Sequence, residues 1–443
     1  MNLMKKVALS ALAAAMMSGA VYADTLTLYT DAKTGQVYTT PGEGRTEMGD
    51  FIDAKSVDMA NREQSSSLSE YQDSMKKYVN VKSKAKTIEF SGTHYFGLTS
   101  VAPKYTNANT ADSTGFELRR NYLQAKAYFN DKDYFRVTMD TTKEIASTTS
   151  NAFMYVKYAY LYLDKVLPYT GVEIGIAHRP WIDYEEHNAW FFRSINKVNV
   201  EQKTTATESG SDLINSADLG FNLQTKTPYI STELGMFNGE GYHADKAAAN
   251  QENSKDLSFE WRLTGHLLGN GEHVGKYKLD KDTYANISTF GIISKNHKDD
   301  NVTVGDHKEY DRSFYGIHAV YNQPEFLIAA QYYADKDDVK YASANDTLRK
   351  GWSINGEIRP MEHWTILGRY DKYKQETETP AGVKTTTSDM TQTIYGVAYE
   401  YNKNVKFIAN GKHISDSKEV AAASEISKAV NKNVYMLTTE VEW

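Results

Sequence analysis

The feature that most constrains this chain is a ladder of short segments, spread over residues 87–443, in which apolar and polar side chains alternate. Phe259, Trp261 and Leu263, for example, are separated by polar residues. This period of two, in segments rich in Tyr, Val, Ile, Phe and Thr, is typical of β-strands with one apolar and one polar face. The sequence therefore predicts an all-β fold made of many strands.

The number and length of these segments indicate a barrel that crosses a membrane. We expect about sixteen strands, an even number, as in outer-membrane barrels. At about 3.3 Å per residue and about 45° of tilt, a strand of ten residues rises about 23 Å, close to the height of the apolar band of such a barrel. The predicted strands begin near Ile88, Phe116, Tyr134, Met154, Gly171, Asp218, Tyr229, Leu257, Tyr284, Arg312, Glu325, Gly351, Trp364, Thr391, Val405 and Asn433.

The links between the predicted strands alternate in length. Short links, four of which contain a proline, take turns with polar links of roughly 11 to 20 residues. The link over residues 269–283 is the exception, because it is long where the alternation expects a short one. The pattern predicts a transmembrane antiparallel β-barrel with short periplasmic turns on one side and long external loops on the other.

Composition separates this barrel from other folds. Hydrophobic residues make up 40% and charged residues 24%, which excludes a helical membrane protein but leaves a β-barrel open, because only alternate strand residues face lipid. A soluble β-sandwich or propeller also strings short strands together. Long loops at every second link, and aromatic pairs near strand ends such as Tyr332 and Tyr333, favour the membrane barrel.

Several kinds of chemistry have no support in the sequence. A net charge of −7 argues against binding of nucleic acid. The absence of cysteine excludes disulfides, thiolate metal sites and a cysteine nucleophile. The 11 histidines form no HExxH pair, and Ser209 lacks the glycine frame of a nucleophile elbow. We therefore expect no cofactor, no metal site and no enzymatic activity.

Residues 1–23 have the three parts of an export signal. Lys5 and Lys6 precede an apolar run of about 11 residues, and residues 21–23 form a small-residue cleavage site. The apolar run is too short to span a bilayer, for which about 20 residues are needed. We expect cleavage after Ala23 and export from the cytoplasm, and an N-terminal core helix is the alternative.

Residues 24–86 lie outside the ladder and are predicted to form a small periplasmic extension. Residues 26–29 and 36–38 are β-formers on either side of a turn, which predicts a hairpin. Two heptads of apolar residues follow, which fit either a short trimeric coiled coil or a plain amphipathic helix or linker. Their stripe consists of Leu68, Tyr71, Met75 and Tyr78.

The signal, the ladder, the extra-long third external link and the terminal aromatic residue together resemble a Gram-negative general or specific porin. The ending Val441-Glu442-Trp443 is similar to the C-terminal signature that the barrel assembly machinery recognises in that class. A narrower resemblance, to the phosphate-selective porin O and P family, rests on residues 115–123, GFELRRNYL, with their paired arginines. These resemblances imply a homotrimer of sixteen-stranded barrels, each with its own pore.

The long third link, near residues 180–217, is expected to fold into the barrel and narrow the pore, as in the porins it resembles. Its Trp and Phe side chains need burial, and its acidic residues lie opposite basic ones, so that a transverse field would select solutes by size and charge. An external loop packed on itself is the alternative. The predicted constriction residues are His178, Arg179, Asp183, Glu185, Glu186 and Arg193.

The polar faces of the strands supply the predicted wall of the pore. Basic and acidic residues are about equally frequent there, whereas a dedicated phosphate channel needs an excess of basic donors. The sequence therefore predicts a general pore with a weak preference between anions and cations. The predicted pore-lining residues are Arg120, Lys126, Arg136, Glu173, Arg262, Glu357, Arg359 and Arg369.

The predicted function is that of a porin in the outer membrane of a Gram-negative bacterium, through which small hydrophilic solutes or ions diffuse passively. Its expected partners are outer-membrane lipid, lipopolysaccharide, those solutes and further copies of the chain. One alternative is a barrel enzyme of lipase or protease type, which needs a serine or aspartate beside His94, His178 or His187. The other is a surface adhesin or structural barrel, which a fully plugged lumen would favour.

Overall fold

The computed structural model describes ten stretches of the chain, in two compact units that are divided between Ser83 and Lys84. The predicted export signal, residues 1–23, and the predicted heptad stripe, residues 68–78, lie outside the described residues. The described stretches are residues 25–52, 84–103, 112–143, 152–205, 207–239, 241–242, 256–298, 309–340, 345–417 and 431–443.

The first unit contains a three-stranded antiparallel sheet. Strands β1 (Thr25–Asp31) and β2 (Val37–Tyr38) form the hairpin, and β3 (Arg45–Ile52), which the sequence pattern does not indicate, pairs with the other edge of β1. The hairpin turn is held by Asp31, whose carboxylate accepts hydrogen bonds from two backbone amides within it. These bonds lower the pKa of Asp31.

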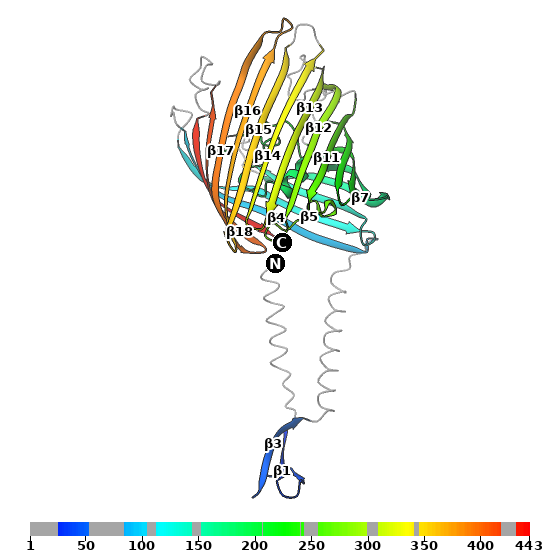
Figure 1. Ribbon diagram of the computed structural model, residues 1–443, viewed down its shortest axis with the longest axis vertical. Coiled ribbons are helices and arrows are strands. Elements are labelled where there is room, and N and C mark those ends of the chain that lie inside the picture. Colours follow the sequence, from blue (N-terminus) through cyan, green and yellow to red (C-terminus); the bar gives the residue numbers. More distant parts are fainter. Residues whose placement is uncertain are drawn as a thin grey trace. The chain divides into compact units, whose positions relative to one another are not determined.

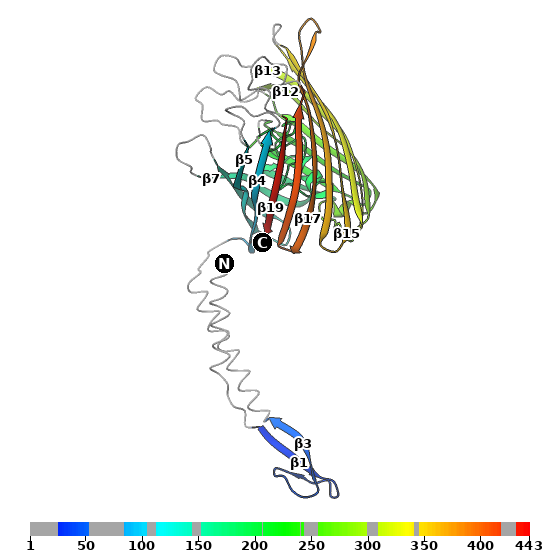
Figure 2. The same ribbon diagram turned by 90° about the vertical axis from the view of Figure 1, so that its left-hand side faces the viewer.

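The second unit is a closed antiparallel barrel of sixteen strands, which confirms the predicted fold class (Figures 1 and 2). All sixteen predicted strands are present. They are β4 (Thr87–Pro103), β5 (Ser113–Tyr128), β6 (Tyr134–Lys143), β7 (Ala152–Leu167), β8 (Thr170–His178), β9 (Ala217–Lys226), β10 (Ile230–Phe237), β11 (Ser258–Leu268), β12 (Tyr284–Lys298), β13 (Glu309–Gln323), β14 (Phe326–Val339), β15 (Asp346–Met361), β16 (Trp364–Glu378), β17 (Lys384–Asn402), β18 (Val405–Asp416) and β19 (Lys432–Glu442).

The barrel closes between its first and last strands. β19 pairs with β4 from Lys432 opposite Pro103 to Glu442 opposite Thr93, and Figure 2 shows the two strands side by side. The last residue extends this seam, because the backbone of Trp443 exchanges two hydrogen bonds with Gly92 and its indole N–H lies 2.9 Å from His94 Nε2. Closure leaves no strand with an unpaired edge.

The polarity of the wall is the reverse of that in a soluble protein. Apolar side chains on one face of the strands are exposed, with Phe116 at 86% and Ile317 at 61%. Charged side chains on the other face are buried, with Glu260 at 2% and Arg262 at 0%. A soluble sandwich would bury the apolar set, because that burial drives its folding. An apolar exterior around a polar lumen fits a barrel in lipid.

One predicted external loop is shorter than expected. Strand β17 begins at Lys384, seven residues before the predicted start near Thr391, and the link from β16 spans only residues 379–383. The added residues are mostly Thr and Ser, which pair with β16 as far as Glu378. Threonine is a good strand former, but this segment lacks the apolar alternation by which strands are recognised.

Two short helical segments interrupt the strands. Helix α3 (Ile182–Asn188) lies in the link between β8 and β9, and the 3-10 helix η1 (Gly271–His273) lies in the long link between β11 and β12. Neither of these described helices has the length and apolar composition needed to cross a bilayer. Both position the site described next.

Candidate functional site

The described part of the link between β8 and β9, residues 179–205 and 207–216, lies inside the barrel, and we call it the inner loop. Inward-facing side chains from strands around the wall donate hydrogen bonds to its backbone carbonyls. Arg119 of β5 reaches the carbonyl of Ser194 at 2.7 Å, and Asn355 of β15 reaches that of Ala189 at 2.7 Å. Strands this far apart in the barrel can contact one loop only within the lumen.

Apolar packing holds the inner loop against one side of the lumen. Trp181 stacks on Phe290 of β12 with ring centroids 3.6 Å apart, and Trp190 is buried to 1% exposure. The inward face of β12–β18 is locally apolar beneath the loop and joins the same cluster through residues such as Phe314 and Leu367. Burial of these aromatic side chains is a large favourable term. The loop therefore leaves the opposite wall, β4–β9, free to line a cavity.

Four of the predicted pore residues anchor the inner loop instead of lining the main cavity. Arg179 donates from Nε to both carboxylate oxygens of Glu260, each at 2.9 Å. Arg262 and Arg369 donate to the carbonyls of Pro180 and Lys197. These side chains lie in the contact between the inner loop and the wall, because a loop that enters a polar lumen must pair the buried groups on both surfaces.

Glu185, the fourth of these residues, points away from the cavity. Its carboxylate accepts hydrogen bonds from the Trp181 indole at 2.8 Å and from Gln331 of β14 at 2.6 Å. Burial raises the pKa of Glu185 to about 8. The side chain therefore adds little negative charge to the pore at neutral pH, whereas the sequence predicts it as an acidic residue of the constriction.

The long link between β11 and β12 meets the inner loop from the side of the short turns. The amide of Gly275 donates to Asn188 Oδ1 at 3.2 Å, and the Tyr284 hydroxyl donates to the Asn188 carbonyl at 2.8 Å. Val274 and Tyr277 join the apolar cluster of the inner loop. This contact explains why the link is long where the alternation expects a turn.

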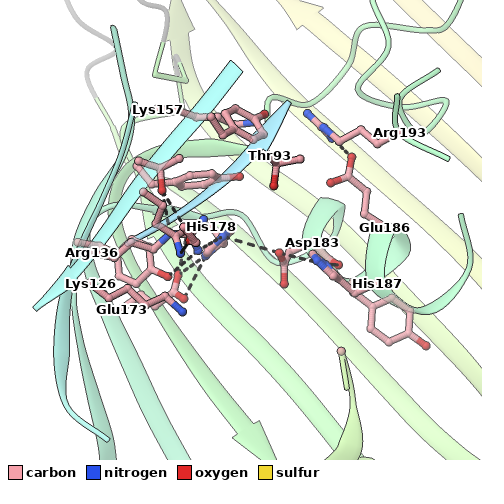
Figure 3. A pocket seen from close by; sticks show the side chains of 18 of the residues that line it. Thr93, Lys126, Arg136, Lys157, Glu173, His178, Asp183, Glu186, His187 and Arg193 are labelled. Atoms are coloured by element: carbon pink, nitrogen blue, oxygen red, sulfur yellow. Dashed lines mark hydrogen bonds and ion pairs between the residues drawn. The ribbon is translucent and has the colours of Figure 1, made fainter. Parts of the chain in front are cut away.

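The cavity lined by the most predicted site residues, which we call the main cavity, has a volume of about 530 Å³ and lies between the inner loop and β4–β9. Figure 3 shows Lys126, Arg136 and His178 on the wall side, across from Asp183 and His187 of helix α3. The predicted site residues that line this cavity are Lys126, Arg136, Glu173, His178, Asp183, Glu186 and Arg193. The structure thus brings together residues from β5, β6, β8 and the inner loop.

Basic groups on the wall face acidic groups on the inner loop across this cavity. His178 lies between them, with Nδ1 at 3.0 Å from Glu173, and Nε2 at 3.3 Å from the Arg136 guanidinium and 3.7 Å from Asp183. Although burial opposes ionisation, His187 and His178 hold the pKa of Asp183 well below its usual range. Asp183 in turn raises the pKa of His187 to about 9.

Two other predicted residues line a second cavity. Glu357 and Arg359, on β15, border a space of about 670 Å³ near the short turns, together with Phe191 and Phe192 of the inner loop. Arg359 donates to Glu357 at 2.9 Å and to Asn322 at 2.6 Å. Arg120, the remaining predicted residue, pairs with Asp140 and lies outside the lining of both cavities.

Two β-bulges add basic residues that alternation alone does not place in the lumen. Arg119 is an extra residue where β5 passes β4, so Arg119 and Arg120 both point inward. Lys157 is the extra residue where β7 passes β6, and it points inward beside Tyr158. A bulge places two neighbouring side chains on one face of a strand. The tyrosine-rich sequence of β7, apolar on both faces, gives the one hint of this irregularity.

The described residues contain no group of three or more His, Asp or Glu side chains that could hold a metal ion. Asp183 and His187 are close, with Nδ1 at 3.3 Å from the carboxylate, but they are neighbours on a single helical turn. Structural metal sites use about four ligands.

No protein-family model matches this chain, and no curated protein matches it. Several solved structures match this chain in fold. An anion-selective porin from Comamonas acidovorans matches with a TM-score of 0.56 at 11% identity, over 81% of this chain and 99% of that one.

A loop L8 deletion mutant of OmpT, an outer membrane protein of Vibrio cholerae, matches with a TM-score of 0.52 at 14% identity, over 81% of this chain and 99% of that one. A trimer form of OmpT matches with a TM-score of 0.50 at 14% identity, over the same shares of the two chains. The chain therefore has the closed, sixteen-stranded antiparallel β-barrel fold of these outer-membrane proteins.

Proposed function

We propose that this protein is an outer-membrane porin through which small hydrophilic solutes and ions diffuse down their gradients. One observation carries the proposal: the barrel is apolar outside and charged inside, and the inner loop packs on one wall and leaves a cavity of about 530 Å³ beside the other. A water-filled lumen narrowed by a charged constriction sorts solutes by size and charge.

Reconstitution in a planar bilayer tests this proposal. The purified, folded protein should give stepwise increases in conductance in potassium chloride. The same protein after heat denaturation should give none, which controls for detergent artefacts. Folded, heat-modifiable protein that inserts without any conductance steps would exclude a porin.

The location and assembly follow from the same proposal. Residues 1–23 are proposed to direct export, residues 24–86 to form a periplasmic extension, and residues 87–443 to form the barrel in the outer membrane of a Gram-negative bacterium. Lipid and lipopolysaccharide would contact the apolar exterior. We also propose a homotrimer, which crosslinking of the detergent-solubilised protein would test.

The paired arginines of β5 do not favour phosphate as the solute. Arg119 is bonded to Glu117 at 3.0 Å, to Glu208 and to inner-loop carbonyls, and Arg120 is paired with Asp140. A phosphate channel needs basic donors that remain free to bind the anion. We therefore propose a general small-solute pore, in which Arg119 holds the inner loop and Arg120 pairs with a neighbouring wall strand.

The pairing of charges around the main cavity nevertheless favours passage of anions over cations. Counting the basic and acidic residues on the strand faces predicts only a weak preference. Four of the five acidic residues that line the main cavity contact a basic partner. Most of the basic lining residues form no ion pair within the described part of the chain. These are Lys126, Arg136, Lys157, Lys226 and Lys276.

His187 should make this anion preference depend on pH. Because its pKa is raised to about 9, the imidazole is protonated at pH 7 and loses its charge as the pH passes 9. One unit charge about 8 Å from a passing ion is worth roughly 0.5 kcal/mol in water, before screening by salt. Raising the pH from 7 to 10 should therefore lower the chloride-to-potassium permeability ratio about twofold through His187 alone.

Reversal potentials of the wild type and of His187→Gln at both pH values isolate this contribution. Other groups, Glu185 among them, titrate equally in both proteins and cancel in the difference. The variant should show a smaller decrease than the wild type. An equal decrease in the two proteins would show that His187 does not act on the permeating ions.

A barrel enzyme remains the second candidate, because the structure places His187 beside Asp183, 3.3 Å apart. A hydrolase also needs a nucleophile within reach of the histidine. Among the described residues, no serine or threonine hydroxyl is hydrogen-bonded to His178 or His187. An adhesin or structural barrel would be favoured by a fully plugged lumen. The described residues leave two cavities in the lumen, so this alternative receives no support.

A further inference from the structure

Three tyrosines and three basic residues are interleaved on the wall of the main cavity. They lie on the neighbouring strands β5, β6 and β7 and all line the 530 Å³ space. We call this set the tyrosine–cation track. It consists of Tyr122 and Lys126 on β5, Tyr134 and Arg136 on β6, and Lys157 and Tyr158 on β7.

Each basic group of the track lies over a tyrosine ring. Lys126 Nζ is 5.1 Å from the ring centre of Tyr134, and the Arg136 guanidinium carbon is 4.7 Å from that of Tyr158. Lys157 Nζ is 4.7 Å from the ring centre of Tyr122 and donates a hydrogen bond to its hydroxyl. Such cation–π contacts stabilise the basic groups without neutralising their charge.

The positive charges of Lys126 and Arg136 are therefore available to a solute, whereas Lys157 is buried behind the Tyr122 ring at 2% exposure. Within the described residues, none of the three basic groups forms an ion pair with a carboxylate. A passing carboxylate can bind Lys126 and Arg136 through charge-assisted hydrogen bonds. The adjacent tyrosines also line the cavity, so an aromatic ring can pack beside them, and a cavity of this volume is in the usual range for small-molecule sites.

We propose that the tyrosine–cation track binds small aromatic carboxylates as they pass through the pore. The proposal rests on the porin function proposed above and specifies a solute class for it. A carboxylate would contact a basic group while its ring packs beside the neighbouring tyrosine. Solutes with the charge alone or the ring alone would satisfy half of the site and bind more weakly.

Block of the ion current by benzoate tests the proposal. In a planar bilayer with potassium chloride, added benzoate should reduce the single-channel current in a saturable manner. Acetate, which lacks the ring, and benzyl alcohol, which lacks the charge, should require about tenfold higher concentrations for the same block. Inorganic phosphate serves as the probe for a site that recognises only charge.

Single substitutions separate the two halves of the site. Lys126→Gln removes one charge and should weaken block by benzoate about tenfold. Tyr134→Leu removes one ring and should weaken it about threefold to tenfold, whereas Tyr134→Phe, which keeps the ring, should retain it. Lys226→Gln is the matched control, because Lys226 lines the same cavity with no tyrosine ring beneath it in the described structure. It should weaken block by benzoate and acetate equally.

The outcomes distinguish this inference from the porin function. Conducting pores that benzoate blocks no better than acetate or phosphate would overturn the track and leave the porin standing. Equal weakening of benzoate and acetate block by Tyr134→Leu would also overturn it. An absence of conductance would instead overturn the porin function on which the inference rests.

Discussion

Replacing Lys126 and Arg136 together with glutamine should lower the chloride-to-potassium permeability ratio of the pore about fourfold. Each of these charges faces the main cavity without a carboxylate partner in the described structure. One unit charge at about 8 Å, screened by about 0.1 M salt, changes the ratio roughly twofold, and the effects of two such charges multiply. The reversal potential in a gradient of potassium chloride measures the ratio directly.

Lys384→Gln is the matched control for this variant. Lys384 begins β17 at the external hairpin, where its side chain is half exposed and far from the lining of the main cavity. The control should keep the wild-type ratio. A folded, conducting double variant that also keeps that ratio would show that the wall charges do not set the preference for anions.

Replacing Glu260 with alanine should destabilise the barrel by about 3–5 kcal/mol. Arg179 and Glu260 are both nearly inaccessible to solvent, with side chains 3% and 2% exposed. Removing the carboxylate leaves the guanidinium buried without its partner, and the start of the inner loop loses its tie to β11. The free energy of unfolding, from denaturant titration of the detergent-folded protein, should fall, and the open channel should close more often.

The double variant Arg179→Met, Glu260→Leu tests whether the loss comes from an unpaired charge. Apolar residues of similar volume in place of a buried ion pair are often neutral. We therefore expect the double variant to recover most of the stability and to restore steady currents. If it is as unstable as Glu260→Ala, the pair contributes through its specific geometry, and the account in terms of desolvation is wrong.

The sequence predicts the strands well because a membrane barrel imposes one rule on nearly every strand residue. Lipid on one side and water on the other require a period of two, and all sixteen strands are found by it. The rule fails at the start of β17, where Thr and Ser pair with β16 outside the apolar band. It also fails at Arg119 and Lys157, because a bulge breaks the period by one residue.

The sequence predicts the residues that line the cavity less reliably than it predicts the strands. Asp183, Glu186 and Arg136 line the cavity as expected, whereas Arg262 and Glu185 lie in the contact between the inner loop and the wall. All five are charged residues in strands or links, and their local sequence does not separate them. What separates them is which side of the inner loop they meet.

By itself the sequence determined the barrel and its strand number, because both follow from local periodicity. It indicated the inward fold of the third link only through a resemblance to porins, with an external loop as the alternative. Only the tertiary structure decided which charges face a passing solute. The inner loop packs its Trp and Phe side chains against one wall, and burial there forces the nearby charges into pairs. Lys126 and Arg136 on the opposite wall lie beside tyrosine rings without a carboxylate partner in the described structure, so their charges act on the solute.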